Sequence, residues 1–298
     1  MDLRRYTLSV LMVVFSFFNF AFASAENFGI ALVHGTNDHR IDAEGGYWKK
    51  EFITLLTNSL PNPDNHVVVA CDYSQSMWHE DAAGCTADQL LTFIDNKKIT
   101  KLVVYTHSDG ANIIRWILSN PTYDPRFLEL GKKIINVVAI SPSSGGTPLA
   151  DEATDGSILF EAIGWLIGYR NDSVLQQRVG DMALYNDELL LGTPGRPSLP
   201  VPFRVIVSSD VTASPFSSAS YCNGYTLNAG LKIAKLYLES CADGFLNCRS
   251  QNIAGTTWFY DIERTQDRTP LSHNQSRHNC FGLETILKND LVELGVSQ

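Results

Sequence analysis

The chain has 298 residues, of which 44% are hydrophobic and only 18% are charged, so it can bury one large core or two smaller ones. This composition excludes a disordered, collagen-like or coiled-coil protein. The formal net charge of -9 argues against nucleic acid as a partner, because phosphate binding requires a basic face.

The first 25 residues have the pattern of an export signal. Arg4 and Arg5 precede an apolar run from Leu8 to Phe22, and small residues lead up to a cleavage point after Ala25. The apolar run has about 15 residues, whereas a membrane span needs about 20. We predict that residues 1–25 are a cleaved signal peptide and that 26–298 form a secreted or periplasmic protein. The alternative is an uncleaved membrane anchor.

The rest of the chain alternates continuous apolar runs with amphipathic segments. Continuous apolar runs are typical of parallel strands that helices cover on both faces. The predicted strands are residues 29–33, 66–70, 102–105, 134–140, 203–208 and 257–260. The predicted helices show apolar faces at Trp48, Phe52, Leu55 and Leu56; at Ala87, Leu90, Leu91 and Ile94; at Ile113, Ile114, Ile117 and Leu118; and at Leu283, Ile286, Leu287, Leu291 and Leu294. We predict one α/β domain built on a doubly wound, mostly parallel sheet.

Residues 151–200 form a long connection between two predicted strands. Within it, the stretch from Ile158 to Tyr169 is almost entirely apolar. Insertions of this kind often cover a binding site, so we interpret residues 151–200 as a cap or lid. The alternative is a buried packing helix.

The six cysteines are even in number and contain no C-x-x-C pair, which favours disulfides over metal ligands in an exported protein. A bridge between Cys71 and Cys85 is the most local pairing. The remaining four cysteines allow three pairings, and a link from Cys241 to Cys248 would close a short loop around Asp243. The histidines outside the proposed site lack metal-ligand spacing, and the sequence predicts neither a metal site nor a cofactor.

The strand at 102–105 runs directly into Thr106-His107-Ser108-Asp109-Gly110 and then into a helix. A strand, a serine in x-x-Ser-x-Gly and a helix are the context of a nucleophile elbow, in which a tight turn exposes the serine oxygen at the carboxyl edge of the sheet. Thr106 occupies a position where glycine is usual. The alternative is an ordinary turn with Ser108 as a helix N-cap.

A serine nucleophile also needs donors for the oxyanion and a histidine base held by an acid. After the first strand, Gly35 lets the chain turn so that the backbone N–H of Thr36 can face the oxyanion. The N–H of Asp109 is the predicted second donor. His107 leaves the backbone in a different direction from Ser108, so we expect it to pack behind the elbow.

Four segments together resemble the secreted bacterial lipase and esterase branch of the α/β-hydrolase superfamily over most of residues 28–280. They are Leu32-Val33-His34-Gly35-Thr36, the Thr-His-Ser-Asp-Gly elbow, Ser141-Pro142-Ser143-Ser144-Gly145-Gly146-Thr147-Pro148-Leu149-Ala150-Asp151 and Ala242-Asp243-Gly244-Phe245-Leu246. The resemblance implies an α/β-hydrolase fold and a serine esterase activity.

Two aspartates compete for the acid and two histidines for the base. Asp210 follows the strand at 203–208, the default position of the acid in the superfamily, whereas the resemblance to lipases favours Asp243. His273 and His278 both lie in the loop after the last strand, and similarity to the lipase loop favours His273. The order serine, aspartate, histidine matches the superfamily.

The sequence therefore predicts an exported serine hydrolase that cleaves carboxylic esters through Ser108, Asp243 and His273. The apolar lid residues favour a small-molecule or lipid-like acyl ester as substrate and a transient contact with a lipid interface, and no obligate protein partner is inferred. The alternatives are an amide, thioester or polyester hydrolase with the same triad, or an inactive hydrolase-like binding protein.

Overall fold

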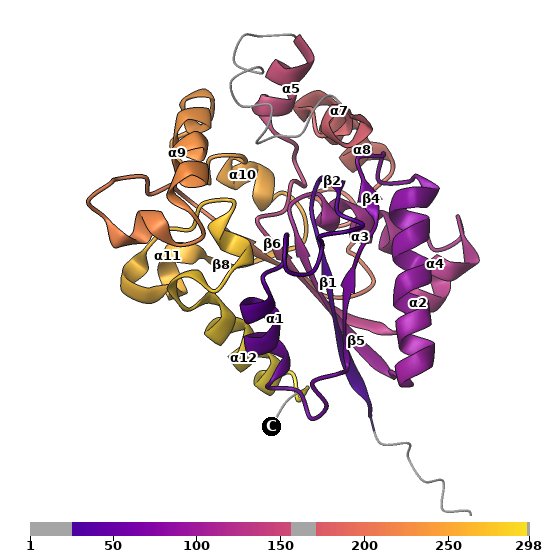
Figure 1. Cartoon of the computed structure of the whole chain (residues 1–298). Helices are drawn as coiled ribbons and strands as arrows, with labels where there is room; N and C mark the ends of the chain where they lie inside the picture. Colours follow the sequence, from indigo (N-terminus) through magenta and orange to yellow (C-terminus); the bar gives the residue numbers. More distant parts are fainter. Residues whose placement is uncertain (1–25, 156–170, 297–298) are drawn as a thin grey trace, which may run out of the picture.

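The computed structural model describes residues 26–155 and 171–296 (Figure 1). Six parallel strands form one sheet in the order β3-β1-β5-β6-β7-β8. The strands are β1 (Phe28–Val33), β3 (His66–Val69), β5 (Lys101–His107), β6 (Ile134–Ile140), β7 (Phe203–Val207) and β8 (Thr256–Tyr260). These are the six predicted strands, with ends that differ by two residues at most, so the doubly wound parallel sheet is confirmed.

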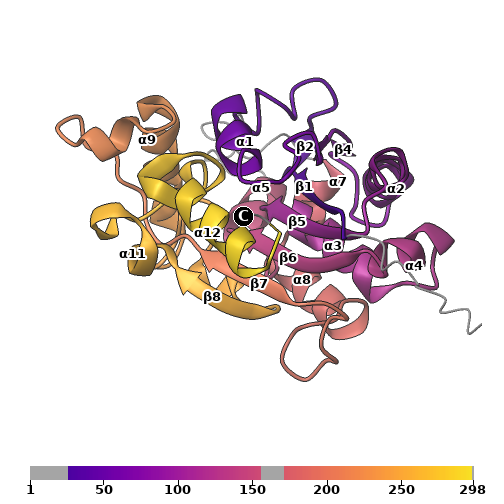
Figure 2. The ribbon, with the colours of Figure 1, turned by 90° about the horizontal axis from the view of Figure 1, so that it is seen from below.

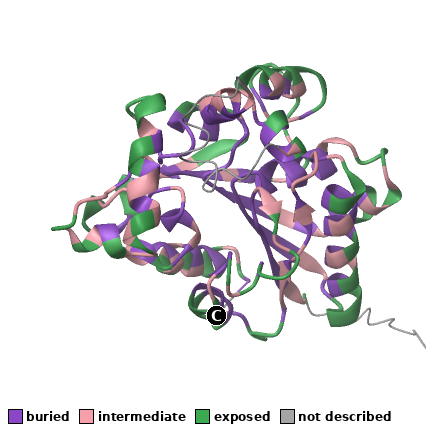
Figure 3. Cartoon of the chain, turned by 45° about the horizontal axis from the view of Figure 1, so that its top comes forward, coloured by how far each residue is buried: buried purple, intermediate pink, exposed green. Residues whose placement is uncertain are grey.

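Alternation along each strand divides the core between the two faces of the sheet. In β1, Ala31 and Val33 face one apolar cluster, whereas Ile30 and Leu32 face the other. All four are fully buried, which explains why the strand reads as a continuous apolar run rather than an alternating one. Figure 3 shows the sheet buried between helices whose outer faces are exposed.

Helices cover both faces, as Figure 2 shows from below. Against the face with Ile30 and Leu32 lie α1 (Lys50–Thr57) and α12 (Leu283–Glu293). Against the other face lie α2 (Cys85–Lys97), α3 (Gly110–Ser119), α4 (Pro125–Gly131) and α8 (Val179–Glu188). The other α-helices among the described residues are α5 (Pro148–Asp155), α7 (Asp172–Gln176), α9 (Tyr225–Ala234), α10 (Cys248–Gln251) and α11 (Asp261–Arg264). Each predicted helix is present, but Trp48, predicted on the face of the first, lies before α1 in a bridge with Glu44, and Leu55 is 37% exposed.

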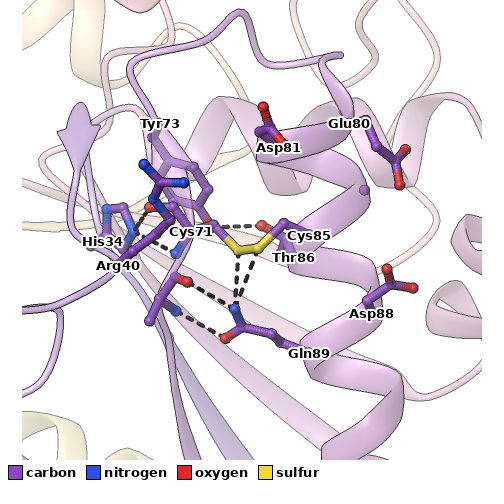
Figure 4. Close-up of a disulfide and its surroundings, with 12 residues drawn as sticks. His34, Arg40, Cys71, Tyr73, Glu80, Asp81, Cys85, Thr86, Asp88 and Gln89 are labelled. Carbon is purple, nitrogen blue, oxygen red and sulfur yellow. Dashed lines mark hydrogen bonds between the residues drawn. A yellow bond between two sulfur atoms is a disulfide. The ribbon is translucent and has the colours of Figure 1, made fainter.

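A second, small sheet lies beside the carboxyl ends of the strands. It pairs β2 (Asn37–Asp38) with β4 (Asp72–Tyr73) in antiparallel fashion. The bridge between Cys71 and Cys85 anchors this region to the start of α2 (Figure 4). The side chain of Gln89, from α2, connects the helix to residue 70: it bonds the backbone N–H and carbonyl of Ala70 and contacts both sulfur atoms of the bridge.

All six cysteines form disulfides: Cys71–Cys85, Cys222–Cys280 and Cys241–Cys248. The predicted local pairing is confirmed, and the other four cysteines adopt one of the three pairings that the sequence left open. Cys222–Cys280 ties the loop before α9 to the segment before α12.

Two predicted features fall outside the described residues. They are the signal peptide at residues 1–25 and the whole apolar stretch from Ile158 to Tyr169. The flanking helices α5 and α7 lie at the top of Figure 1, beyond the carboxyl ends of the strands. Within residues 26–155 and 171–296, no helix combines the length and apolar character that crossing a bilayer requires.

Candidate active site

Ser108 lies in the turn between β5 and α3 with a backbone φ of 55°. A side chain in this left-handed region is strained, and such strain at a strand-to-helix turn is the mark of a nucleophile elbow. Gly110 makes the turn possible, since a Cβ there would collide with the carbonyl oxygen of His34. Thr106, in place of the usual glycine, is accommodated as a buried residue of β5.

The imidazole of His273 reaches the serine across 165 positions of sequence. His273 Nε2 lies 3.1 Å from Ser108 Oγ, which is hydrogen-bond distance. The ring of Phe245 stacks on the imidazole with centroids 4.9 Å apart, and the side chain of His273 is only 13% exposed. The histidine is thus held beside the hydroxyl and can accept its proton.

The carboxylate of Asp243 lies on the other side of that imidazole. Asp243 Oδ2 is 2.8 Å from His273 Nδ1, and Oδ1 accepts the backbone N–H groups of Phe245 and Leu246. The backbone N–H of His273 in turn donates to the carbonyl of Asp243 at 2.9 Å. The fully buried Asp243 therefore fixes the ring of the histidine through its carboxylate and the main chain of the histidine through its backbone carbonyl.

The two rival residues lie elsewhere. Asp210 is 44% exposed and pairs with Lys232 and Lys235 instead of a histidine. His278 is buried, and neither of its ring nitrogens has a hydrogen-bond partner within the described part of the chain. Burial lowers its pKa to about 2. The structure thus brings Ser108, His273 and Asp243 together and leaves both alternatives out.

The two predicted oxyanion donors flank the serine. Thr36 follows β1, the neighbour of β5 in the sheet, and a Cβ at Gly35 would lie 2.8 Å from the Cβ of Ser108. Only glycine therefore allows this loop to approach the elbow. Among the residues that the structure describes, no acceptor takes the backbone N–H of Thr36 or Asp109. Both groups are available to a bound oxygen.

The helix α7 and the residue after it hold the side chains of both donor residues, and no sequence pattern predicts these contacts. From α7, Ser173 Oγ and Gln176 Nε2 donate to the carboxylate of Asp109 at 2.7 and 3.0 Å. The next residue, Gln177, donates to Thr36 Oγ1 at 2.9 Å. Burial raises the pKa of Asp109, and these donors counteract that rise. The connection at 151–200 therefore contributes directly to the geometry of the site.

A second network, also missed from sequence, joins the oxyanion loop to the histidine. Tyr47 Oη packs against Gly35, where a Cβ would lie 2.5 Å from it. The same hydroxyl lies 2.5 Å from His107 Nδ1, while His107 Nε2 lies 2.9 Å from the carbonyl oxygen of His273. Since a carbonyl only accepts, the proton of His107 is on Nε2, and Tyr47 donates to Nδ1. Burial raises the pKa of Tyr47 to about 12 and holds that of His107 well below its usual value, so both stay neutral.

A pocket of about 310 Å³ opens onto Ser108 and His273. One wall is apolar and the other is polar. The apolar wall consists of Leu227, Leu231 and Phe245; the polar wall includes Asn37, His39, Asn274 and Arg277. Within the described residues, no group of three or more histidine, cysteine, aspartate or glutamate side chains could hold a metal ion.

No protein-family model matches the chain, and no curated protein matches its sequence. Solved structures do resemble it. The mature lipase BlEst2 of Bacillus licheniformis aligns with a TM-score of 0.59 at 14% identity, over 92% of this chain and 94% of its own. Lipase 1 of Pelosinus fermentans gives 0.59 at 11% identity, over 90% and 98% of the two chains. EstA of Clostridium botulinum gives 0.54 at 14%, over 89% and 86%.

These likenesses establish the fold. The chain has the α/β-hydrolase fold of bacterial lipases and esterases, as the resemblance of its motifs implied. At such low identity, activity has to be argued from the site itself.

Proposed function

We propose that this chain is an exported serine hydrolase that cleaves carboxylic esters. The proposal depends mainly on two contacts at hydrogen-bond distance: Ser108 Oγ lies 3.1 Å from His273 Nε2, and His273 Nδ1 lies 2.8 Å from the carboxylate of Asp243. The strained turn at Ser108 adds support, because such a turn is retained where a hydroxyl must project into a site.

In the proposed reaction, Ser108 Oγ attacks the ester carbonyl while His273 takes its proton. Asp243 keeps the imidazole in the tautomer that accepts at Nε2 and stabilises the imidazolium that forms. The backbone N–H groups of Thr36 and Asp109 bind the oxyanion. His273 then protonates the leaving alcohol, and water hydrolyses the acyl-enzyme by the same steps.

A lipid-like acyl group is the substrate that the apolar wall of the pocket favours. Leu227 and Leu231 project from α9, and Phe245 comes from the loop that carries Asp243. Apolar lining of this kind binds an acyl chain through burial alone, at roughly 0.8 kcal/mol for each buried methylene. Initial rates of hydrolysis of a butyrate ester, a palmitate ester and an amide, compared at equal substrate concentration, test this preference.

Export is supported by the three disulfides, since such bridges persist in oxidising compartments. Together with the N-terminal pattern, they favour a secreted or periplasmic protein. Sequencing the N-terminus of the mature protein from culture medium or periplasm tests cleavage after Ala25.

The triad is tested by replacing each member beside its rival. We expect Ser108→Ala, His273→Asn and Asp243→Asn each to lose most turnover of p-nitrophenyl butyrate, on the order of a thousandfold or more. Asp210→Asn and His278→Asn are the matched controls and should retain it. A fluorophosphonate probe should label wild type at Ser108 only. Undiminished turnover by Ser108→Ala would refute the proposal.

A further inference from the structure

The polar wall of the pocket contains a cation, Arg277, that no carboxylate of residues 26–155 and 171–296 pairs with. Arg277 lines the pocket four residues after His273. Among the described residues, no carboxylate oxygen lies within 4.0 Å of its guanidinium. Asp42 acts on Arg277 only at longer range and makes its own contact with His39 at 2.8 Å. Within the described part of the chain, no aspartate or glutamate lines the pocket.

The protein fixes this guanidinium in place without neutralising it. Its plane lies over the ring of Tyr47 with 3.9 Å to the centroid. Nη1 donates to the carbonyl of Tyr47 at 2.9 Å, and Nη2 donates to the amide oxygen of Asn274 at 2.8 Å. An arginine carries five N–H donors, so three remain without an acceptor in the described part of the chain. Burial lowers the pKa of Arg277, as expected for a charge that lacks a counter-ion.

A fixed, uncompensated arginine inside a pocket suits an anionic oxygen of the ligand, because guanidinium groups recognise carboxylates and phosphates through directed, charge-assisted bonds. The apolar wall, with Leu227, Leu231 and Phe245, suits an apolar chain. Ser108 lines the same pocket. The lining therefore fits a substrate that combines an ester bond with an apolar part and an anionic part.

We propose that Arg277 is a specificity-determining residue and that the preferred substrate is an ester bearing a carboxylate or phosphate group in addition to the scissile bond. This inference rests on the proposed esterase function. The anion would displace water from the free N–H groups of Arg277 while the ester carbonyl lies at Ser108.

Two matched substrate pairs test the inference and distinguish the two kinds of anion. The first pair is the mono-p-nitrophenyl ester of adipate and the same ester with its free carboxylate methylated. The second pair is dihexanoyl glycerophosphate and dihexanoylglycerol. Their hydrolysis is measured as the release of hexanoate, at concentrations below those at which the lipids form micelles. We expect kcat/KM to favour the anionic member of at least one pair by about tenfold or more, as one charge-assisted contact allows.

Three variants connect that preference to Arg277. Arg277→Gln should bring the ratio of anionic to neutral kcat/KM to near one, and Arg277→Lys should restore part of it. Asn274→Asp places a carboxylate against Nη2 with almost no change in shape, so it should also abolish the preference even if Arg277→Gln folds poorly. Arg268→Gln removes an equal charge at an exposed position outside the pocket and should leave the ratio unchanged.

A wild-type ratio at or below one in both pairs overturns the inference, as does a ratio that survives both Arg277→Gln and Asn274→Asp. Cleavage of the neutral esters without preference would refute only the role of Arg277. Absence of cleavage of every ester, with Ser108→Ala equal to wild type, would instead refute the proposed function.

Discussion

Two buried tyrosines provide a direct test of the network behind the elbow. The hydroxyl of Tyr47 packs against Gly35 and bonds Nδ1 of His107. The hydroxyl of Tyr105 is also buried but has no hydrogen-bond partner within the described residues. Tyr47→Phe and Tyr105→Phe therefore remove the same atom from two environments that differ in hydrogen bonding.

The expected costs differ in size. Tyr47→Phe leaves the buried Nδ1 of His107 without its partner, and at about 1–3 kcal/mol for one such group we expect it to lower the free energy of unfolding by about 1–3 kcal/mol. Tyr105→Phe removes an unsatisfied hydroxyl and should change it by less than about 0.5 kcal/mol or raise it. Because the lost bond orients His107, which bonds the carbonyl of His273, Tyr47→Phe should also lower kcat by about tenfold.

Urea unfolding at neutral pH measures the first quantity, and initial rates with p-nitrophenyl butyrate at saturation measure the second. The slope of the unfolding free energy against urea should be the same for both variants, so that midpoints can be compared. Equal destabilisation by the two substitutions would refute the reasoning. So would a kcat for Tyr47→Phe that equals that of wild type.

Three further predictions follow from other contacts. Gln177→Leu removes the donor to Thr36 Oγ1, so kcat should fall by about three- to tenfold with little change in KM. The control Gln89→Leu, which lies beside the Cys71–Cys85 bridge, should leave kcat unchanged. His278 stays neutral in the folded state down to its pKa of about 2 but is protonated below about 6.5 when unfolded, so its contribution to stability is lost as the pH falls below about 6.5. When the pH is lowered from 6.5 to 4.5, the free energy of unfolding of His278→Leu should therefore fall by about 2 kcal/mol less than that of wild type, as measured by urea unfolding. An equal fall in the two proteins would contradict this. Removing the Cys222–Cys280 bridge, which closes a loop of 58 positions, should lower the free energy of unfolding by about 4 kcal/mol. Removing the Cys71–Cys85 bridge, whose loop has 14 positions, should lower it by about 3 kcal/mol. The reverse order in urea or thermal unfolding would contradict loop entropy as the cause.

The sequence predicts the sheet and the elbow well because both are encoded locally. Buried parallel strands must be apolar at every position, and the turn at Ser108 needs glycine nearby. Each of these signals lies within about ten residues. The pairing of β2 with β4 involves only two residues on each side and leaves no periodic pattern, so it could not be predicted.

The contacts around the site were harder to predict because they join distant segments. Tyr47 and His107 are 60 positions apart, and Gln177 reaches Thr36 over 141. Neither tyrosine nor glutamine carries a sequence signal for such a role. The choice of Asp243 over Asp210 depended on resemblance, and the structure places Asp243 against His273 because residues 242–247 form a tight loop that turns the carboxylate inward.

The Cys241–Cys248 bridge closes that loop at its base, where the N–H of Cys248 also bonds the carbonyl of Cys241. Reduction would release the segment that carries the acid while leaving the sheet and the serine turn intact. A variant that lacks only this bridge, Cys241→Ser with Cys248→Ser, should thus fold but turn over substrate weakly, whereas protein produced in a reducing cytosol would lose all three bridges and with them stability as well. Production in an oxidising compartment, with reductants omitted from the assay buffer, is the appropriate choice for every kinetic comparison described above.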